Sequence, residues 1–385
     1  MRVLFAATRG AGHFNPMVPF VEACRRGGHD VLVIGPPPLA ETVERAGYPF
    51  APGAEPPDEE LGPVWGRVPT ASFEEAERLV IQEIFATLNV RAMLPAMRAV
   101  ARDWRPDVII REPAEFASAV VAEEEGIAHV QVGTGLVLSH VLMASIAEAA
   151  VESWGRGLTE RIAGTPYLTL FPDSLEDPDV QGPPSVHRFR DPAADAPTQP
   201  LPDWWPGDDR ALVYVTFGSA TASVPTAAPI YDVARESVAN LPARVLLTTG
   251  VAIDGDGPQP PGPHVRVERW VPQADVLAQA AAVVCHGGSG TTLGALAAGV
   301  PLVVTPLFAD QPYNGRRVAA VGAGLVVEPR DQGAMRSAVD PGDLRDAIAT
   351  VMAGEGYGRA AAVIAADIRG LPPADDALEL LSAVA

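Results

Sequence analysis

The sequence of 385 residues contains no lysine, so every basic side chain other than histidine is arginine. Without lysine the chain cannot form a Schiff base with a carbonyl substrate or with pyridoxal phosphate. It also cannot supply the lysine that a P-loop uses to hold phosphates. Schiff-base aldolases, pyridoxal-phosphate enzymes and P-loop kinases are therefore excluded.

Positive charge, cysteine and long apolar runs are also scarce. The net charge is -20 and no basic cluster occurs, which argues against nucleic acid or an anionic membrane surface as partner. Cys24 and Cys285 lie far apart in apolar surroundings, which indicates buried thiols in a reducing compartment. Residues 2–8 already form an apolar strand, and no run of about 18 apolar residues follows. We therefore expect a cytoplasmic protein without signal peptide or membrane span, as a monomer or homodimer.

The apolar runs that are present are short, and several end in glycine-containing turns. Residues 2–8 lead into a turn with Gly10 and Gly12, and residues 212–216 lead into Phe217-Gly218-Ser219. This pattern is typical of parallel strands joined by helices, and the length suits two α/β lobes. Proline-rich residues 182–209 are predicted to be an irregular linker, and residues 50–70 a long loop. The lobes would then span residues 1–200 and 210–368.

The turn at residues 286–292 predicts a diphosphate site. It reads HGGSGTT, follows an apolar strand, and opens a helix that ends at Gly299 before Pro301. The first amides of a helix are unpaired and the helix dipole favours negative charge, so such a turn binds anions. Since lysine is absent, amides, hydroxyls and His286 must hold the phosphates.

His13 and Glu112 each follow an apolar strand, and strand order should bring them together. Ligands of open α/β sheets bind at the carboxyl ends of the strands, which places His13 suitably for chemistry. Glu112 is a candidate to orient the imidazole, and the alternative is a surface carboxylate that caps the next helix. The glycines before His13 begin a dinucleotide pattern, but Asn15 takes the third glycine's place. We therefore do not favour a nicotinamide cofactor.

Residues 269–314 resemble the nucleotide-sugar signature of family 1 glycosyltransferases of the GT-B fold, which decorate plant and bacterial natural products. The fixed spacings that carry the resemblance are Trp270, Pro272-Gln273, residues 286–291, residues 299–301, Asp310-Gln311 and Asn314. The resemblance implies two Rossmann-like lobes with parallel sheets facing across a cleft. The N-lobe would hold the acceptor and the C-lobe the donor, with residues 369–385 crossing back to the N-lobe.

The same resemblance implies roles for individual residues. His13 would be the catalytic base and Glu112 its partner, where many relatives have aspartate. Trp270 would stack on the donor's base, although a buried core tryptophan is the alternative. Asp310 would bond sugar hydroxyls, or alternatively cap a helix. The donor set as a whole is Ser219, Trp270, Val271, Gln273, His286, Gly288, Ser289, Gly290, Thr291, Asp310 and Gln311.

Acceptor residues are predicted from apolar side chains of the N-lobe. Ile81, Ile84, Phe85 and Leu88 lie on one helical stripe, and Met93 extends it. Core packing is the favoured explanation for most of this stripe, while some of its side chains would line an apolar acceptor cleft, and a single histidine on a helix is commonly structural. The acceptor candidates are Trp65, Phe85, Met93 and His140.

The chemistry implied is an inverting, metal-independent transfer without a cofactor. Asp177-Pro-Asp179 and Asp254-Gly-Asp256 match a metal-binding DxD, but both lie in turns where acidic residues are expected anyway. Relatives that use UDP-glucose often have a ribose-binding glutamate where this chain has Gly294, so we expect a dTDP-deoxysugar, with a UDP-sugar as alternative. The alternatives in function are a non-hydrolysing nucleotide-sugar 2-epimerase and a non-catalytic helper that binds nucleotide sugar.

Overall fold

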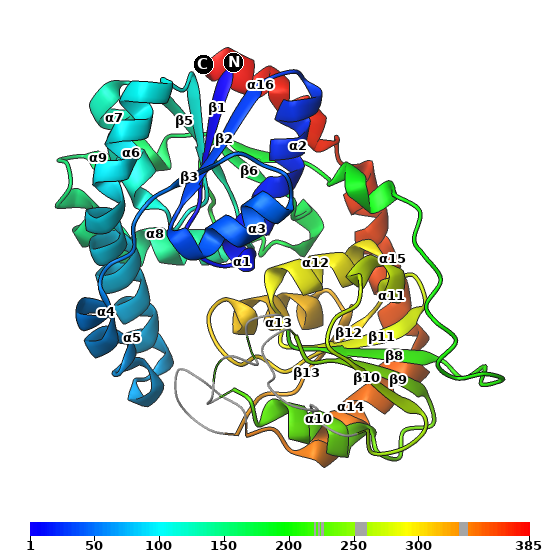
Figure 1. The fold of residues 1–385 in the computed structure, drawn as a ribbon. Helices are drawn as coiled ribbons and strands as arrows, with labels where there is room; N and C mark the ends of the chain where they lie inside the picture. Colours follow the sequence, from blue (N-terminus) through cyan, green and yellow to red (C-terminus); the bar gives the residue numbers. More distant parts are fainter. Residues whose placement is uncertain (219–220, 222–223, 225–226, 251–259, 331–337) are drawn as a thin grey trace. The chain divides into compact units, whose positions relative to one another are not determined.

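The computed structural model describes residues 1–218, 221, 224, 227–250, 260–330 and 338–385 (Figure 1). The chain divides into two compact units. The first contains Met1–Ala193 together with Leu371–Ala385, and the second contains Ala194–Gly370. Each unit has its own parallel sheet and its own core, so the predicted α/β class with two Rossmann-like sheets is confirmed.

The sheet of the first unit has the strand order β3-β2-β1-β4-β5-β6-β7, and every neighbouring pair is parallel. Its central strands are buried throughout most of their length because helices cover both faces. The strands are β1 (Arg2–Ala6), β2 (Asp30–Gly35), β3 (Phe50–Pro52), β4 (Val108–Arg111), β5 (Ala128–Val132), β6 (Tyr167–Thr169) and β7 (Val186–Arg188).

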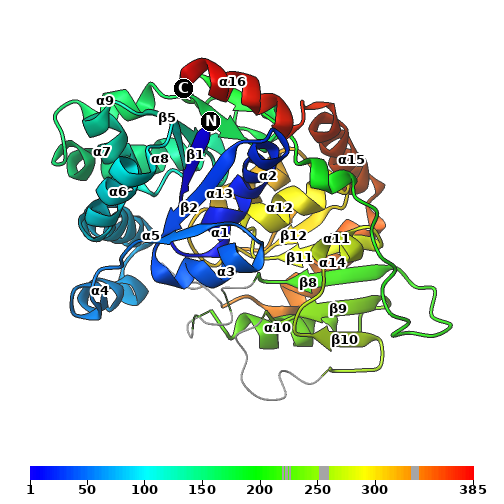
Figure 2. The same ribbon diagram turned by 45° about the horizontal axis from the view of Figure 1, so that its top comes forward.

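Figure 2 shows the helices of the first unit around this sheet. They are α1 (Ala11–Phe14), α2 (Val18–Arg26), α3 (Ala40–Arg45), α4 (Asp58–Trp65), α5 (Phe73–Arg78), the π-helix η4 (Leu79–Asn89), α6 (Val90–Trp104), α7 (Phe116–Glu125), α8 (Val137–Glu152), α9 (Leu158–Ala163) and α16 (Ala377–Val384).

The C-terminal segment is tied to the first unit by polar contacts. Helix α16 packs against α2, and the two chain ends lie near each other in this unit (Figure 1). Arg26 makes a bidentate ion pair with Asp375, with Nε–Oδ1 and Nη2–Oδ2 distances of 2.8 and 2.9 Å. Arg190 forms a parallel bridge with Pro373. These contacts keep the last helix beside residues that are far away in the sequence.

Two segments predicted to be irregular contain regular elements. Residues 50–70 form β3 and α4, and the proline-rich segment contains β7 and a 3₁₀ turn, Pro192–Asp195. Helix α4 begins with three acidic residues, which suit the positive end of the helix dipole. Strand β7 forms because it pairs with β6 at the edge of the sheet. Such pairing depends on tertiary context, which local composition does not express.

Residues Phe73–Trp104 form one helical segment of 32 residues with a π-helix in its middle. By length and composition alone it is long and apolar enough to cross a membrane, although charged residues interrupt its apolar runs, as the sequence showed. Its buried side chains, which include Met93 and Met97, belong to the core of the first unit. The wider π-turn also breaks the predicted stripe, because Ile81 and Ile84 are buried while Phe85 is only partly buried.

The second unit has a six-stranded parallel sheet in the order β10-β9-β8-β11-β12-β13. Helices α12 and α15 pack side by side (Figure 2). The strands are β8 (Leu212–Thr216), β9 (Arg244–Thr248), β10 (Val265–Glu268), β11 (Ala280–Cys285), β12 (Leu302–Val304) and β13 (Gly324–Val326). The helices are α10 (Ile230–Val238), α11 (Gln273–Leu277), α12 (Ser289–Ala297), α13 (Gln311–Ala320), α14 (Pro341–Ala353) and α15 (Glu355–Gly370).

Both cysteines have the environment predicted from the sequence. Cys24 in α2 and Cys285 at the end of β11 are unpaired and buried. Burial raises the pKa of each thiol to about 12. Neither sulfur is therefore a thiolate at neutral pH, and both act as small apolar side chains.

Candidate active site

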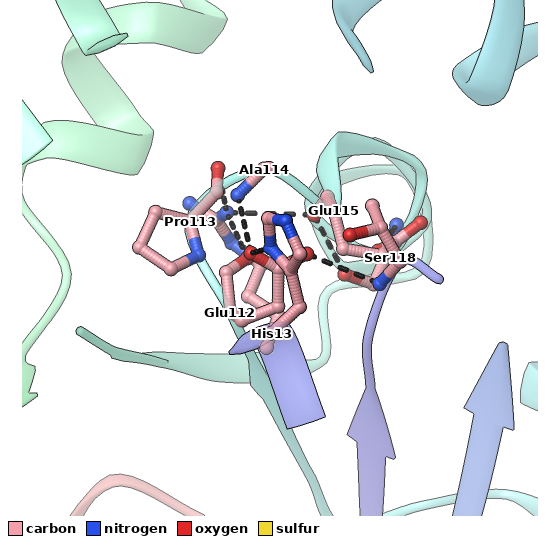
Figure 3. A network of polar contacts seen from close by, with 8 residues as sticks. His13, Glu112, Pro113, Ala114, Glu115 and Ser118 are labelled. Atoms are coloured by element: carbon pink, nitrogen blue, oxygen red, sulfur yellow. Dashed lines mark hydrogen bonds and ion pairs between the residues drawn. The ribbon is translucent and has the colours of Figure 1, made fainter. Parts of the chain in front are cut away.

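His13 and Glu112 meet at the carboxyl ends of two adjacent strands of the first unit. Strands β1 and β4 pair with Ala6 opposite Arg111, so the turns that follow them begin side by side. Gly10 has a φ of 105°, which lets the chain turn sharply into α1. His13 Nδ1 lies 3.1 Å from Glu112 Oε2 (Figure 3). The structure thus brings together the two residues of the predicted catalytic pair.

Glu112 is fully buried, yet its carboxylate has several hydrogen-bond donors. The backbone amide of Thr8 donates to Oε1 over 3.1 Å, and that of Ala114 donates to Oε2 over 2.8 Å. Burial by itself raises the pKa of Glu112, but the charge and hydrogen bond of His13 together with these two amides outweigh burial and lower that pKa. The carboxylate therefore stays ionised inside the first unit.

The ionised carboxylate fixes the tautomer of His13. Since Glu112 can only accept, the imidazole donates its Nδ1–H, and Nε2 is the basic nitrogen. The side chain of His13 is 28% exposed, so solutes can reach it. Phe85 of the π-helix packs edge-on against the imidazole, with ring centroids 5.7 Å apart. This geometry suits a general base that accepts a proton from a hydroxyl group.

The predicted diphosphate turn lies at the carboxyl end of β11 in the second unit. Gly287 has a φ of 84°, and a Cβ atom there would lie 2.7 Å from Val304 Cγ1, so no other residue fits. Gly288 is the N-cap of α12, which begins at Ser289. The amides of the first turn of α12 have no intrahelical acceptor and coincide with the positive end of the helix dipole. The turn therefore presents donors to an anion.

His286 lies between two glycines and is neutral. Cβ atoms added at Gly218 and Gly288 would lie 3.1 and 2.4 Å from its Nε2, so only glycine leaves room for the ring. Its Nδ1 is buried, and within the described residues it has no hydrogen-bond partner. Burial lowers the pKa of His286 to about 4. The side chain can therefore contribute a hydrogen bond, but no positive charge, to a diphosphate.

Ser289, Asp310 and Asn314 form a hydrogen-bonded group beside this turn. Ser289 Oγ donates to Asp310 Oδ2 over 2.6 Å. Asn314 Nδ2 donates to the same carboxylate oxygen and to the carbonyl of Gly287, over 3.0 and 2.8 Å. Asp310 is the N-cap residue of α13 but makes no side-chain capping hydrogen bond. Its carboxylate thus braces the turn instead of capping the helix.

Some of the remaining donor candidates are exposed to solvent, and others make hydrogen bonds within the second unit. Trp270 is 65% exposed, which overturns the alternative of a buried core tryptophan, and Val271 beside it is partly exposed. Gln273 Nε2 donates to Thr291 Oγ1 over 3.3 Å. Gln311 is buried, and its Oε1 accepts from the amides of Leu307 and Phe308. Gly290 is exposed in the first turn of α12, whereas Ser219 lies outside the described residues.

The four acceptor candidates differ in exposure, and Phe85 packs against the core cluster that contains Met93. Trp65 is 44% exposed at the end of α4, and Phe85 contacts His13. Met93 is buried in the core of the first unit, where its Sδ accepts from the Ala54 amide. His140 is buried against Tyr167, with ring centroids 4.6 Å apart. Met93 and His140 pack inside the unit, and their acceptor role stays a prediction.

Of the two DxD segments, only Asp177-Pro-Asp179 lies within the described residues. The Asp179 amide donates to Asp177 Oδ1 over 3.1 Å, which is an ordinary turn interaction. Asp254 and Asp256 lie outside the described residues. Across the described ranges, no three His, Cys, Asp or Glu side chains are grouped so that they could hold a metal ion.

Sequence reasoning did not single out Arg111 or assign a role to Asn314. Arg111 is the last residue of β4 and is fully buried beside Glu112. A charged residue inside an apolar run that is predicted to be a central strand was the available signal. Asn314 was part of the motif, but its contacts with Asp310 and Gly287 depend on how α13 packs against α12.

Comparisons with known proteins agree with this geometry. Residues 22–169 and 232–383 match the family models of the N-terminal and C-terminal domains of erythromycin biosynthesis protein CIII-like proteins. The elloramycin glycosyltransferase of Streptomyces olivaceus is 33% identical over 100% of this chain and 97% of its own length. The TDP-daunosamine transferase of Streptomyces peucetius is 29% identical over 97% and 94%.

A solved structure of spinosyn rhamnosyltransferase complexed with thymidine diphosphate superposes with a TM-score of 0.77. It is 22% identical and covers 99% of this chain and 100% of that one. That likeness supports the fold, while the sequence matches support the family. The chain therefore belongs to the erythromycin biosynthesis protein CIII-like family and is a glycosyltransferase of the GT-B fold.

Proposed function

We propose that this glycosyltransferase transfers a deoxysugar from a dTDP-sugar to a hydroxyl group of an apolar, polyketide-like natural product. The observation that carries the proposal is the 3.1 Å contact between His13 Nδ1 and Glu112 Oε2. It gives the first unit an oriented base at the carboxyl end of its sheet, where ligands of such sheets bind. The donor turn at His286 to Thr291 provides the matching anion site in the second unit.

The proposed chemistry is a single displacement at the anomeric carbon. His13 Nε2 takes the proton as the acceptor O–H bond breaks, and the acceptor oxygen bonds to the anomeric carbon. The bond from that carbon to the diphosphate oxygen breaks, so dTDP leaves with the electron pair. One displacement inverts the anomeric centre. Glu112 stabilises the imidazolium, and the amides of α12 stabilise the negative charge that develops on the leaving group.

No metal is required for this scheme, because the donors at the turn replace it. Ser289 starts α12, and the neutral His286 adds a ring nitrogen. The glycosyl group becomes positively charged in the transition state while the diphosphate becomes more negative, so preorganised donors act mainly during the reaction.

The choice of dTDP rests on the donor unit and on the relatives. Gly294 lies in α12, where it cannot offer a side chain to a ribose hydroxyl. One relative is described as a TDP-daunosamine transferase, and the structure of the rhamnosyltransferase is described as a complex with thymidine diphosphate. Both descriptions support a donor with a 2′-deoxyribose, and the likeness to an elloramycin glycosyltransferase supports a natural product as acceptor.

A panel assay tests the proposal directly. The wild-type protein is incubated with several dTDP-deoxysugars or UDP-glucose and a set of polycyclic aglycones, and glycosides are detected by mass spectrometry. We expect product with a dTDP-sugar. His13→Ala should reduce kcat by about 10²- to 10⁴-fold, the usual contribution of a general base, while dTDP binding measured by calorimetry stays the same. Full turnover by His13→Ala would remove His13 from the role of base.

The same assay separates the alternative functions. Family membership favours transfer over 2-epimerisation, and an epimerase would convert a nucleotide sugar in the absence of any acceptor. A helper protein would bind dTDP but give no glycoside with any aglycone. Binding without turnover across the whole panel would therefore argue for the helper.

A further inference from the structure

Arg111 is an arginine enclosed in the core of the first unit, next to the catalytic pair. It ends β4, is 0% exposed, and directly precedes Glu112. Phe116 lies under its guanidinium, with Cζ 6.0 Å from the ring centroid. Removing an arginine from water is expensive unless its donors are satisfied.

Only one nitrogen of this guanidinium has partners among the described residues. Nη1 donates to the carbonyls of Glu112, Pro113 and Glu115, each over 3.4 Å. Nε and Nη2 are buried and have none within that part of the chain. Three long hydrogen bonds offset little of the desolvation cost. Three carbonyls of the turn of residues 112–115 nevertheless accept hydrogen bonds from this one side chain.

We propose that Arg111 is a positioning residue for the base: it holds the turn that presents Glu112, and its positive charge keeps the His13–Glu112 pair unprotonated until the pair takes the acceptor's proton. The proposal rests on the proposed function of His13. It explains why a costly buried charge stands beside the site, since an apolar residue of similar volume at position 111 would ordinarily be as stable or more stable.

The charge of Arg111 contributes to the pKa of three buried titratable groups of the first unit, and Glu112 in turn helps to hold Arg111 in its charged form. Glu115, in the same turn, is buried and caps α7 by accepting from the Ser118 amide over 2.8 Å. Burial raises the pKa of Glu115, and Arg111 opposes that rise. Burial lowers the pKa of His129 in β5 and His140 in α8 to about 4, and the charge of Arg111 is the next largest cause for both.

The expected effect has a definite sign. A positive charge nearby disfavours binding of a proton by either member of a coupled pair. Burial lowers the pKa of Arg111 itself to about 10, so the guanidinium remains charged at neutral pH. Removing that charge should make the pair hold its proton more tightly. The acidic limb of the rate profile should then move to higher pH.

The test compares Arg111→Met and Arg111→Gln, which are neutral, with Arg111→Lys, which keeps the charge but loses the planar fork. We measure kcat/KM for glycosyl transfer from pH 5 to 9. The acidic limb should move up by about one pH unit in the neutral variants, a typical size for a nearby charge, and stay in place in Arg111→Lys with a lower kcat. A uniform loss of rate without a shift in any neutral variant would reduce Arg111 to a structural role.

A second readout does not depend on turnover. ¹⁵N NMR titration of the His13 imidazole should show its protonation midpoint at higher pH in both neutral variants than in wild type. Arg111→Gln retains an amide donor for the turn, so it provides a folded neutral variant if Arg111→Met is too unstable. An unchanged midpoint would overturn the proposal. Absence of glycosyl transfer by the wild type, with a shifted midpoint, would count against the proposed function alone.

Discussion

Ser289 Oγ donates a hydrogen bond to Asp310 Oδ2 over 2.6 Å, so the first hydroxyl of the diphosphate turn is already committed to a carboxylate. The same oxygen accepts from Asn314, which also holds the carbonyl of Gly287. Asp310 thus keeps a negative charge next to a turn that is built for an anion. A carboxylate at this place repels the diphosphate and weakens its binding. Its presence is explained if it accepts hydrogen bonds from hydroxyl groups of the donor's sugar.

The Asp310→Asn variant tests whether this carboxylate binds the sugar and not the diphosphate. Without the carboxylate, dTDP should bind as tightly as to wild type or tighter, because a repulsive charge is gone. Turnover of the dTDP-sugar should fall about tenfold or more, the loss expected for one hydrogen bond to a charged group. Calorimetry with dTDP and steady-state kinetics measure the two effects. Ser289→Ala, which leaves Asp310 in place, is the matched control; a weaker affinity for dTDP in Asp310→Asn would contradict this assignment.

Trp270→Ala should weaken nucleotide binding without affecting the fold. The indole is 65% exposed, so the folded protein loses little packing when it is removed. Stacking of a base on an aromatic ring contributes about 1–3 kcal/mol, which corresponds to a dTDP affinity about 5- to 160-fold lower. Calorimetry gives the affinity and thermal unfolding the stability. Trp65→Ala, at another exposed tryptophan, should leave dTDP affinity unchanged.

Gly294→Glu should shift the donor preference towards UDP-sugars. A Cβ at this position would make ordinary contacts of 3.4 Å with Gln273 Oε1 and Leu277 Cδ1, so the helix can accept a side chain there. A carboxylate that accepts from ribose hydroxyls should raise the ratio of kcat/KM for UDP- over dTDP-sugars about tenfold. Gly294→Ala is the control and should not alter the ratio. If the ratio of kcat/KM for UDP- over dTDP-sugars were the same in wild type and Gly294→Glu, residue 294 would not contribute to recognition of the ribose.

His140 should make the first unit sensitive to acid. Its pKa is lowered from 6.5 to about 4, first by burial and then by the charge of Arg111. Between these values the unfolded chain binds a proton at residue 140 that the folded chain does not, so stability falls as pH drops from 6.5 to 4 and the loss then levels off. The full effect is at most about 3 kcal/mol.

His140→Phe keeps an aromatic ring against Tyr167 and removes the titration. Urea unfolding at a series of pH values should show that the variant loses less stability than wild type between pH 6.5 and 4. If the free energy of unfolding changed with pH in the same way in the variant and in wild type, His140 would not be buried in its neutral form.

The donor half was predictable because its information is local. Turn glycines, a helix start and a strand occur within about thirty residues, and each has its own backbone reason, such as the positive φ of Gly287. The His13–Glu112 contact also follows from strand order, since adjacent parallel strands end at one edge of the sheet. The sequence alone therefore determined the α/β class, the transferase family and the two turns.

Tertiary structure decided what burial and pairing control. Residues 186–188 form a strand because they pair with β6 at the edge of the sheet. The predicted helical stripe around Phe85 lies in a π-helix, and the ring of Phe85 packs beside His13. Tertiary structure also exposed Trp270, buried Met93 and His140, and enclosed Arg111 behind Glu112. None of these outcomes follows from neighbours along the chain, because exposure and electric field depend on groups that the fold brings together from distant positions.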